Sequence, residues 1–418
     1  MDKSKKDDKL IYWNLYYNNF ENFFINFLIL IFVIFIFYLS QKNYYGADHD
    51  TFAIISSFIV MVEDGYYSPS RSFGNILAEI IFGFLVFFSG AKITSFIVAL
   101  LFIFSILNFY FAFNQSNSLD IRSKIFFLLC VSNPILLFDN LNIIDFILSL
   151  FFFSAGCLLI KKKRNVFGII LLSFAIGCRL NFSAFAVIFL LLYFRNDMKA
   201  LLNYLVLLVV ISSLFYLSIF LTNNLSLSFL NNTIGLRYEN IGGSSFIIYD
   251  QIGRFVYKII KAFGTLPFFI ILIFIFNYLI SGKLKKIYVN YRFEFYLILF
   301  NLILFFLIPT KTSIISMVMI LSYLIIKDLI KRRYLYVIIF LNLLSFFIVF
   351  DFLKIDYRHK DPCKAKQAVN ASFELNLKKG YLERYLIDSK NNLECSYKEF
   401  PKKYSNAYLL QKKLYKND

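Results

Sequence analysis

Two short polar segments after the first hydrophobic run carry the residues best suited to chemistry. Asp48 and Asp50 lie in the first segment, and Arg71 lies in the second, a turn rich in Gly, Tyr, Pro and Ser between residues 63 and 74. A carboxylate can take a proton from a hydroxyl nucleophile, and an arginine can hold a phosphate with two parallel N–H groups. Because 59% of the chain is hydrophobic, solubility alone does not explain these charges. We therefore interpret this stretch as a candidate site.

The elements that position these residues are predicted to be membrane helices. The chain has 418 residues, among them 55 Phe and 29 Tyr. Apolar runs of about 15 to 23 residues recur between residues 23 and 350, roughly the length that crosses a hydrocarbon core of about 30 Å. The net charge of +18 is spread over short clusters between these runs and in the tail, which is typical of membrane topology rather than of nucleic-acid binding. The sequence thus predicts an all-α polytopic membrane protein with no nucleic-acid partner.

Lysine and arginine clusters predict the orientation of the spans, because short basic loops resist translocation and stay in the cytoplasm. The clusters lie at residues 3–9, 122–124, 161–164, 195–199, 283–292 and 327–333. They order about eleven crossings, with the N-terminus inside and the C-terminus outside: 23–40, 93–113, 125–138, 143–160, 165–178, 181–195, 200–222, 263–281, 294–309, 312–326 and 334–351. No cleavable signal pattern precedes the first run, so we expect it to remain as the first span.

This order divides the chain into three parts. A cytoplasmic N-terminus covers residues 1–22, a transmembrane domain covers 23–351, and an extracytoplasmic tail covers 352–418. Residues 75–91 form one apolar run that is left over, and they carry Glu79, a costly charge in lipid. We expect this run to be a helix at the outer interface, inside a first outer loop of residues 41–92. The expected location is the cytoplasmic membrane of a bacterium or archaeon.

Three predicted hairpin tips face the same outer side as this loop. The first tip carries Asp139, Asn140, Asn142 and Asp145, the second carries Arg179 and Asn181, and the third carries residues 309–312 with Lys311. The helices that flank Arg179 are shorter than the usual span of about 20 residues, so we expect this arginine below the surface, where it needs an anionic partner. A later outer segment, residues 223–262, adds Arg237, Arg254 and Lys258. Acids and cations are thus predicted to converge on one membrane face.

The outer loop and the first tip resemble the GT-C superfamily of integral-membrane glycosyltransferases. In that superfamily an acidic residue or pair opens the first outer loop, and a Gly-Tyr turn leads into a Pro- or Gly-containing segment. The matching residues here are Asp48, Asp50, Phe52, Gly65, Tyr66, Pro69, Arg71 and Gly74. The similarity covers residues 20–200. In place of adjacent acids, this chain has His49 between its two aspartates, and Gly74 and Asn75 stand where many members have Pro.

The resemblance implies that a sugar is transferred, with inversion, from a polyprenyl-phosphate donor to an acceptor on the outer membrane face. The acceptor would be a lipid, a glycan or a protein, and membrane lipid would surround the site. Asp48 or Asp50 would take the proton from the acceptor hydroxyl. The leaving phosphate needs positive charge, for which the candidates are Arg71, Arg179, Arg237, Arg254 and Lys311. Oxygen ligands at Asp48, Asp50, Asp139 and Asp145 suit a divalent cation such as Mg or Mn, although their spacing does not demand one.

Structural roles and other functions compete with this interpretation. Asp48 and Asp50 suit the N-terminus of a helix, Asp145 suits the start of the helix near residue 146, and Arg179 suits an ion pair. A cell-surface polysaccharide polymerase or ligase would also use lipid-linked sugars. A lipid-linked sugar flippase or another transporter would have as many spans, but its charges would lie near the bilayer midplane.

The tail contains two cysteines that bear on the orientation. Cys363 and Cys395 are able to form a disulfide if the tail lies outside the cell, where conditions are oxidising. The pattern of residues 365–385 predicts a helix. We expect the tail either to cover the outer site or to be a solvated appendage.

Overall fold

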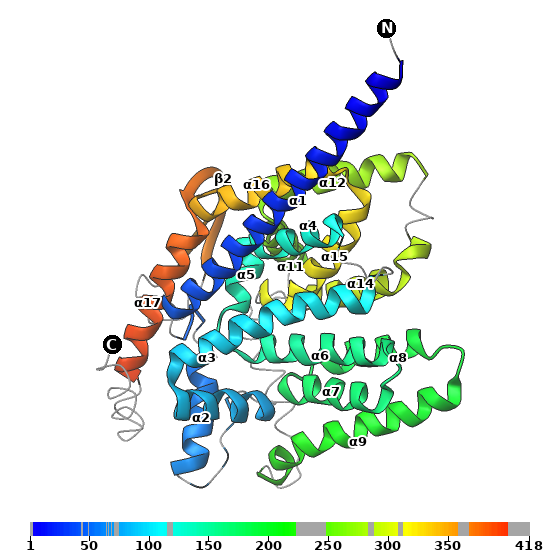
Figure 1. Cartoon of the computed structure of the whole chain (residues 1–418). Helices are drawn as coiled ribbons and strands as arrows, with labels where there is room; N and C mark the ends of the chain where they lie inside the picture. Colours follow the sequence, from blue (N-terminus) through cyan, green and yellow to red (C-terminus); the bar gives the residue numbers. More distant parts are fainter. Residues whose placement is uncertain are drawn as a thin grey trace.

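The computed structural model describes most of the chain and places it in helices (Figure 1). The described residues are 3–42, 45–48, 50–63, 65, 67, 69–70, 75–114, 120–222, 248–282, 288–307, 312–357 and 368–399. One two-stranded sheet, formed by β1 and β2, accompanies the helices in the described part. The predicted all-α class is therefore confirmed, with a small hairpin added near the C-terminus.

The helices follow one another through most of the chain. They are α1 (Lys3–Lys42), α2 (Asp50–Glu63), α3 (Ile76–Phe113), α4 (Ile121–Ser132), α5 (Pro134–Asn140), α6 (Asp145–Lys161), α7 (Asn165–Cys178), α8 (Phe182–Tyr193), α9 (Met198–Thr222), α11 (Ile248–Phe263), α12 (Thr265–Ile280), α14 (Arg292–Leu307), the short 3-10 helix η1 (Thr312–Ile315), α15 (Ser316–Leu329), α16 (Arg332–Phe347) and α17 (Tyr381–Glu399).

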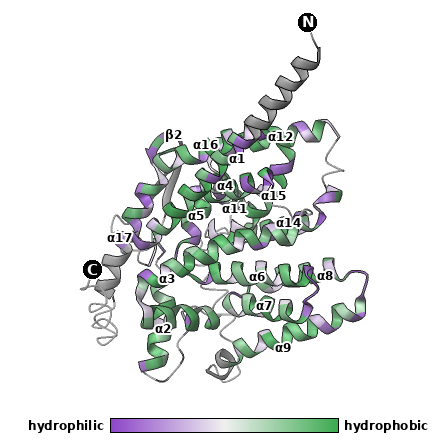
Figure 2. Ribbon diagram, viewed as in Figure 1, coloured by the Kyte–Doolittle hydropathy of each residue, from purple (hydrophilic) through white to green (hydrophobic). Residues whose placement is uncertain are grey.

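Several of these helices suit a membrane by length and composition. Four described segments qualify as spans, residues 19–42, 76–113, 198–217 and 312–329, or up to six if each of two bent pairs counts as one span. Figure 2 shows hydrophobic residues along most of the helical body. The chain thus has the helices of an integral membrane protein. The count of about eleven crossings is not confirmed, since helices such as α7 and α8 fall short of the usual span of about 20 residues.

The two bent pairs meet at one buried asparagine. α4 and α5 are bent by 71° at Asn133, and α11 and α12 are bent by 98° at Gly264. The side chain of Asn133 accepts a hydrogen bond from Leu136 N–H at 2.8 Å, which caps α5. Its amide nitrogen donates to the Ala262 carbonyl and to the Tyr323 hydroxyl, both at 2.9 Å. One side chain therefore fixes the positions of α5 and α11 relative to each other.

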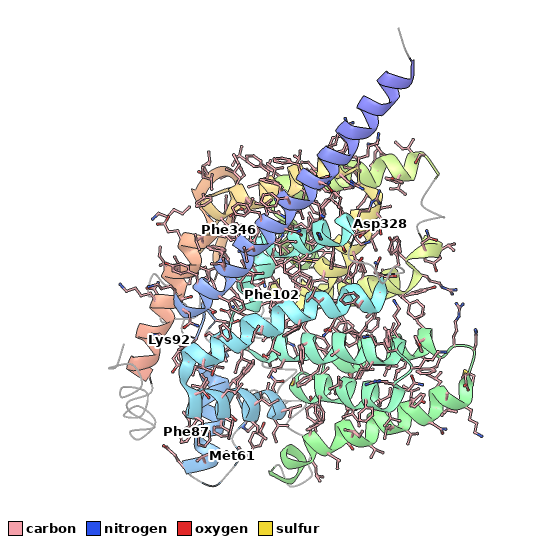
Figure 3. The ribbon with its side chains drawn as sticks, in the orientation of Figure 1. Met61, Phe87, Lys92, Phe102, Asp328 and Phe346 are labelled. Carbon is pink, nitrogen blue, oxygen red and sulfur yellow. The ribbon has the colours of Figure 1, made fainter. Side chains whose placement is uncertain are left out.

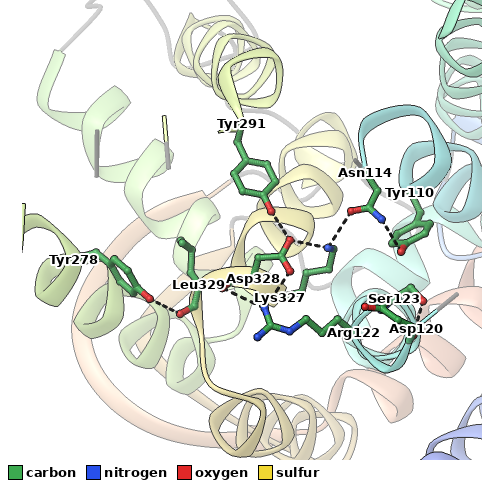
Figure 4. A network of polar contacts seen from close by, with 10 residues as sticks. All are labelled: Tyr110, Asn114, Asp120, Arg122, Ser123, Tyr278, Tyr291, Lys327, Asp328 and Leu329. Atoms are coloured by element: carbon green, nitrogen blue, oxygen red, sulfur yellow. Dashed lines mark hydrogen bonds and ion pairs between the residues drawn. The ribbon is translucent and has the colours of Figure 1, made fainter. Parts of the chain in front are cut away.

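Basic clusters that were predicted to share one membrane face lie in a connected polar network (Figure 4). Arg122 and Lys327 both bind the carboxylate of Asp328, at 3.2 and 2.7 Å. Lys327 also donates to the Asn114 side chain at 3.2 Å, and Lys161 donates to the Asn114 carbonyl at 2.7 Å. Figure 3 shows Asp328 and Lys92 at opposite ends of the helical body. Members of three predicted clusters, Arg122, Lys161 and Lys327, thus lie together, and that they face the cytoplasm stays a prediction.

The first outer loop is organised around Glu79, which is 1% exposed. α3 contains a break at Gly90, whose φ of 78° favours glycine. The break lies next to the predicted boundary between the interfacial run and the following span. The Glu79 carboxylate accepts hydrogen bonds from Ser57 Oγ at 3.1 Å, from Tyr67, and from the Ser70 backbone N–H at 2.9 Å. This residue is therefore a polar contact that ties the returning loop to α3.

The tail differs from the predicted helix over residues 365–385. β1 (Ile348–Tyr357) and β2 (Ala368–Lys379) form an antiparallel hairpin, and a helix, α17, begins only at Tyr381. The prediction was wrong because residues 369, 371, 373, 375 and 377 are apolar in alternation, which is the period of a strand. Gly380 joins β2 to α17 against the end of α16. A Cβ at this position would overlap the Phe346 carbonyl oxygen and the backbone of Phe347.

We predict that Gly380→Ala displaces α17 from the helical body. The added methyl group meets backbone atoms, which cannot move aside as the end of a flexible side chain does. Hydrogen exchange of the α17 amides in the full-length protein should rise, and the thermal unfolding midpoint should fall. Gly253→Ala is the matched control, because a Cβ there meets nothing within 4 Å. Equal exchange in both variants would contradict the role assigned to Gly380.

Candidate functional site

A cavity of about 520 Å³ opens where residues from the outer loop, the first tip, α11, η1 and α17 come together. Its polar lining consists of Asp48, Asp50, Asp139, Asn142, Lys258, Lys261, Thr312, Ser313, Tyr381, Arg384, Tyr385 and Asp388. Figure 1 shows α17 at the left of the view beside α5, which it contacts. The cavity thus brings carboxylates and cations into one space, whereas Arg179 and Asn181 of the second predicted tip do not line it.

The predicted acidic pair stands at the start of α2, with both residues on the cavity wall. Asp48 Oδ1 accepts a hydrogen bond from the Asp50 N–H at 3.0 Å, and the Asp48 carbonyl accepts one from the Thr51 N–H at 3.2 Å. This is the capping role that competed with catalysis in the sequence. The two roles are compatible, because capping uses one oxygen of the carboxylate and orients the group.

Asn142 holds the acidic loop against the first tip and the tail. Its Oδ1 accepts a hydrogen bond from the Ala47 N–H at 2.8 Å and one from the Tyr385 hydroxyl at 3.5 Å. Its amide nitrogen donates to the Phe138 carbonyl at 3.1 Å. The ring of Phe138 in turn stacks on Tyr385, with centroids 4.4 Å apart and an interplanar angle of 14°. Three separate parts of the chain are therefore joined beside the two aspartates.

Asp139 is the carboxylate of the first tip that reaches the cavity. Its Oδ2 is buried and has no hydrogen-bond partner among the described residues, while Thr312 bonds to the carboxylate. Lys258 and Lys261 attract this carboxylate electrostatically, and the carboxylate of Asp48 repels it. A buried carboxylate oxygen without a donor is costly, so Asp139 is available to a ligand that enters the cavity.

Cations enter the cavity from α11 and α17. Lys258 and Lys261 lie three residues apart on α11, a spacing that places them on the same face of a helix. Arg254 lies one turn earlier on α11, where it is exposed and is not part of the cavity lining. The sequence singled out Lys258 as part of an outer segment, but it did not single out Lys261. The spacing of 254, 258 and 261 was the available signal.

One face of α17 closes the cavity. Tyr381, Arg384, Tyr385 and Asp388 follow the i, i+3, i+4, i+7 pattern of a single helical stripe and all line the cavity. Burial raises the pKa of the Tyr381 and Tyr385 hydroxyls, so both remain neutral donors at ordinary pH. The sequence did not identify these residues, because it placed the helix too early in the tail.

The other acid of the first tip belongs to an ion pair. Asp145, which is fully buried, accepts a hydrogen bond from Arg179 Nη1 to its Oδ2 at 2.8 Å. The Arg179 guanidinium also lies over the Phe146 ring, 5.5 Å from its centroid. Neither residue lines the cavity. The predicted anionic partner of Arg179 is therefore Asp145, and a phosphate-binding role for this arginine stays a prediction.

Several predicted residues lie outside the described part of the chain. These are Arg71, Arg237, Lys311 and Cys363, and the side chain of Cys395 is likewise not described. Their assigned roles as phosphate-binding groups and as a disulfide stay predictions. Within the described residues, no cluster of three or more His, Cys, Asp or Glu side chains suits a metal ion. The expected divalent cation also stays a prediction.

Comparison with known proteins gives no match. No family model, no curated protein sequence and no solved structure matches the chain. The resemblance to the GT-C superfamily therefore rests on the residues of the first outer loop. The feature of the structure that bears on function is the cavity with its charged lining.

We predict that Arg179→Gln lowers the free energy of unfolding by about 3 to 5 kcal/mol, because it leaves the Asp145 carboxylate buried without its cation. The double variant with Asp145→Asn should recover part of the loss, since it removes the uncompensated charge. Denaturant titration of the protein in micelles measures both changes. Arg195→Gln, at an exposed position, serves as the control. Unchanged stability in Arg179→Gln would show that the ion pair with Asp145 does not stabilise the fold.

Proposed function

We propose that the chain is an integral-membrane glycosyltransferase that moves a sugar from a polyprenyl-phosphate donor to an acceptor hydroxyl. The observation that supports this proposal best is that carboxylates and cations line one cavity. Asp48, Asp50 and Asp139 lie on its walls together with Lys258 and Lys261. Such a site has both the base and the positive charge that displacement of a phosphate from a sugar requires.

The proposed reaction is a single displacement. The acceptor oxygen attacks the anomeric carbon while the bond from that carbon to the phosphate oxygen breaks. The acceptor proton passes to Asp48 or Asp50, and the polyprenyl phosphate leaves with the electron pair. Attack on the face opposite the leaving group inverts the anomeric configuration. For this reaction the chain would supply a proton acceptor, Asp48 or Asp50, and the positive charge of Lys258 and Lys261 from the lining of the same cavity.

The cations of α11 suit the donor phosphate. Lys258 and Lys261 lie in the last two turns of α11, just before its bend into α12, and both are partly buried. Charge interactions are stronger where water is scarce. Lysine acts as a point charge on a flexible stem and is able to follow the phosphate as it gains charge. The sequence analysis assigned the donor phosphate to Arg71, Arg179, Arg237, Arg254 and Lys311. We add Lys258 and Lys261 to these candidates, because both line the cavity.

A comparison of lipid extracts tests the proposal without knowledge of the sugar. Deletion of the gene should cause a polyprenyl-phosphate sugar to accumulate with the sugar exposed on the outer face, together with a glycan that lacks that sugar. Accumulation confined to the inner face would instead support a flippase. Loss of polymer length with normal decoration would support a polymerase or ligase.

We predict that Asp48→Asn or Asp50→Asn, expressed in the deletion strain, fails to restore sugar transfer. Loss of a general base slows such reactions by about 10²- to 10⁴-fold, and the variant that loses activity identifies the base. Glu63→Gln is the matched control, because Glu63 is exposed at the far end of the same helix. Full transfer by both aspartate variants, at wild-type protein levels, would show that neither residue is the base.

A further inference from the structure

The guanidinium of Arg384, which lines the cavity, has an incomplete set of hydrogen bonds. Its Nη2 is buried and has no hydrogen-bond partner among the described residues. Its described neighbours are the Tyr381 ring, whose centroid lies 5.6 Å away, and Lys261, which carries the same charge. A buried guanidinium nitrogen that makes no bond costs free energy, as does a like charge beside it. An anion between Arg384 and Lys261 would relieve both costs.

The geometry points to Arg384 as a phosphate-binding residue contributed by the tail, so that α17 forms part of the ligand site. This inference rests on the proposed function, because it names the group that the donor phosphate would contact. Arginine binds phosphate through parallel N–H donors, which the α11 lysines cannot provide. Lys258 and Lys261 approach the cavity from α11 and Arg384 approaches it from α17.

The attachment of α17 supports this role. The helix is held by the stacking of Tyr385 on Phe138 and by the bond from Tyr385 to Asn142. The hairpin before it is anchored through Asp351, which binds Lys378 at 2.7 Å and Tyr257 at 3.3 Å. Tyr257 lies next to Lys258 on α11. The tail is thus fixed to the helix that carries the lysines, and Arg384 is held at a set position against them.

The test uses the full-length protein in lipid nanodiscs and three probes: farnesyl phosphate, inorganic phosphate and farnesol. Dissociation constants are measured for wild type, Arg384→Gln, Arg384→Lys and Lys390→Gln. Lys390 is exposed on the same helix and is the matched control. Thermal unfolding of each variant verifies that α17 stays folded.

We predict that Arg384→Gln weakens farnesyl phosphate binding about tenfold or more, the loss expected for a hydrogen bond to a charged group. Binding of farnesol should not change, Arg384→Lys should recover part of the affinity, and Lys390→Gln should behave as wild type. If inorganic phosphate shows the same dependence on Arg384, the phosphate alone is recognised. If only farnesyl phosphate shows it, the lipid is needed to place the phosphate.

Two results would overturn the inference, and they differ in what they say of the function. Equal binding of farnesyl phosphate by wild type and Arg384→Gln would remove Arg384 from the site and leave the proposed function standing. Equal binding of farnesyl phosphate and farnesol by wild type would show that the cavity has no anion subsite. That second result would remove the main support for the proposed function as well.

Discussion

The cost of burying charge in an apolar helical body determines where the polar residues of this chain lie. Glu79 is buried beneath the outer loop and is surrounded by hydroxyl and N–H donors. Asp145 is fully buried and is matched by Arg179. Lys327 is 3% exposed and is matched by Asp328. At the cavity, two charged side chains of the lining, Asp139 and Arg384, each keep a buried polar atom without a hydrogen bond among the described residues.

Incomplete matching at this place follows from the way the helices end. The bends at Asn133 and Gly264 change the direction of the chain between α4 and α5 and between α11 and α12. The end of α5, which carries Asp139, and the end of α11, which carries Lys261, both border the cavity. Without the bend at Asn133, α5 would continue in the direction of α4 and would not lie where it now lines the cavity. Asn133 pairs with two backbone groups at these bends, the Leu136 N–H and the Ala262 carbonyl.

The sequence was informative where a rule depends on chain order alone. Basic loops belong to one face, so the tips between them belong to the other, and Asp48, Asp50 and Asp139 do line one cavity. It was less informative where the partner depends on tertiary geometry. Asp139 and Asp145 lie on one tip, yet only the packing of α6 against α7 decides that Asp145 binds Arg179. The hairpin was missed although apolar residues at 369, 371, 373, 375 and 377 alternate with polar ones, which is the period of a strand.

The tail contributes one wall of the candidate site through α17. Its charged and aromatic stripe on α17 faces residues that lie more than two hundred positions earlier in the chain, as in the bond from Tyr385 to Asn142. A ligand that contacts both α11 and α17 necessarily favours the docked position of the tail, because it binds only when both parts are in place. By the same linkage, any change that loosens the docking of α17 must lower the affinity for that ligand, even if no atom that contacts the ligand is altered. The tail would then affect affinity through its docking as well as through its side chains.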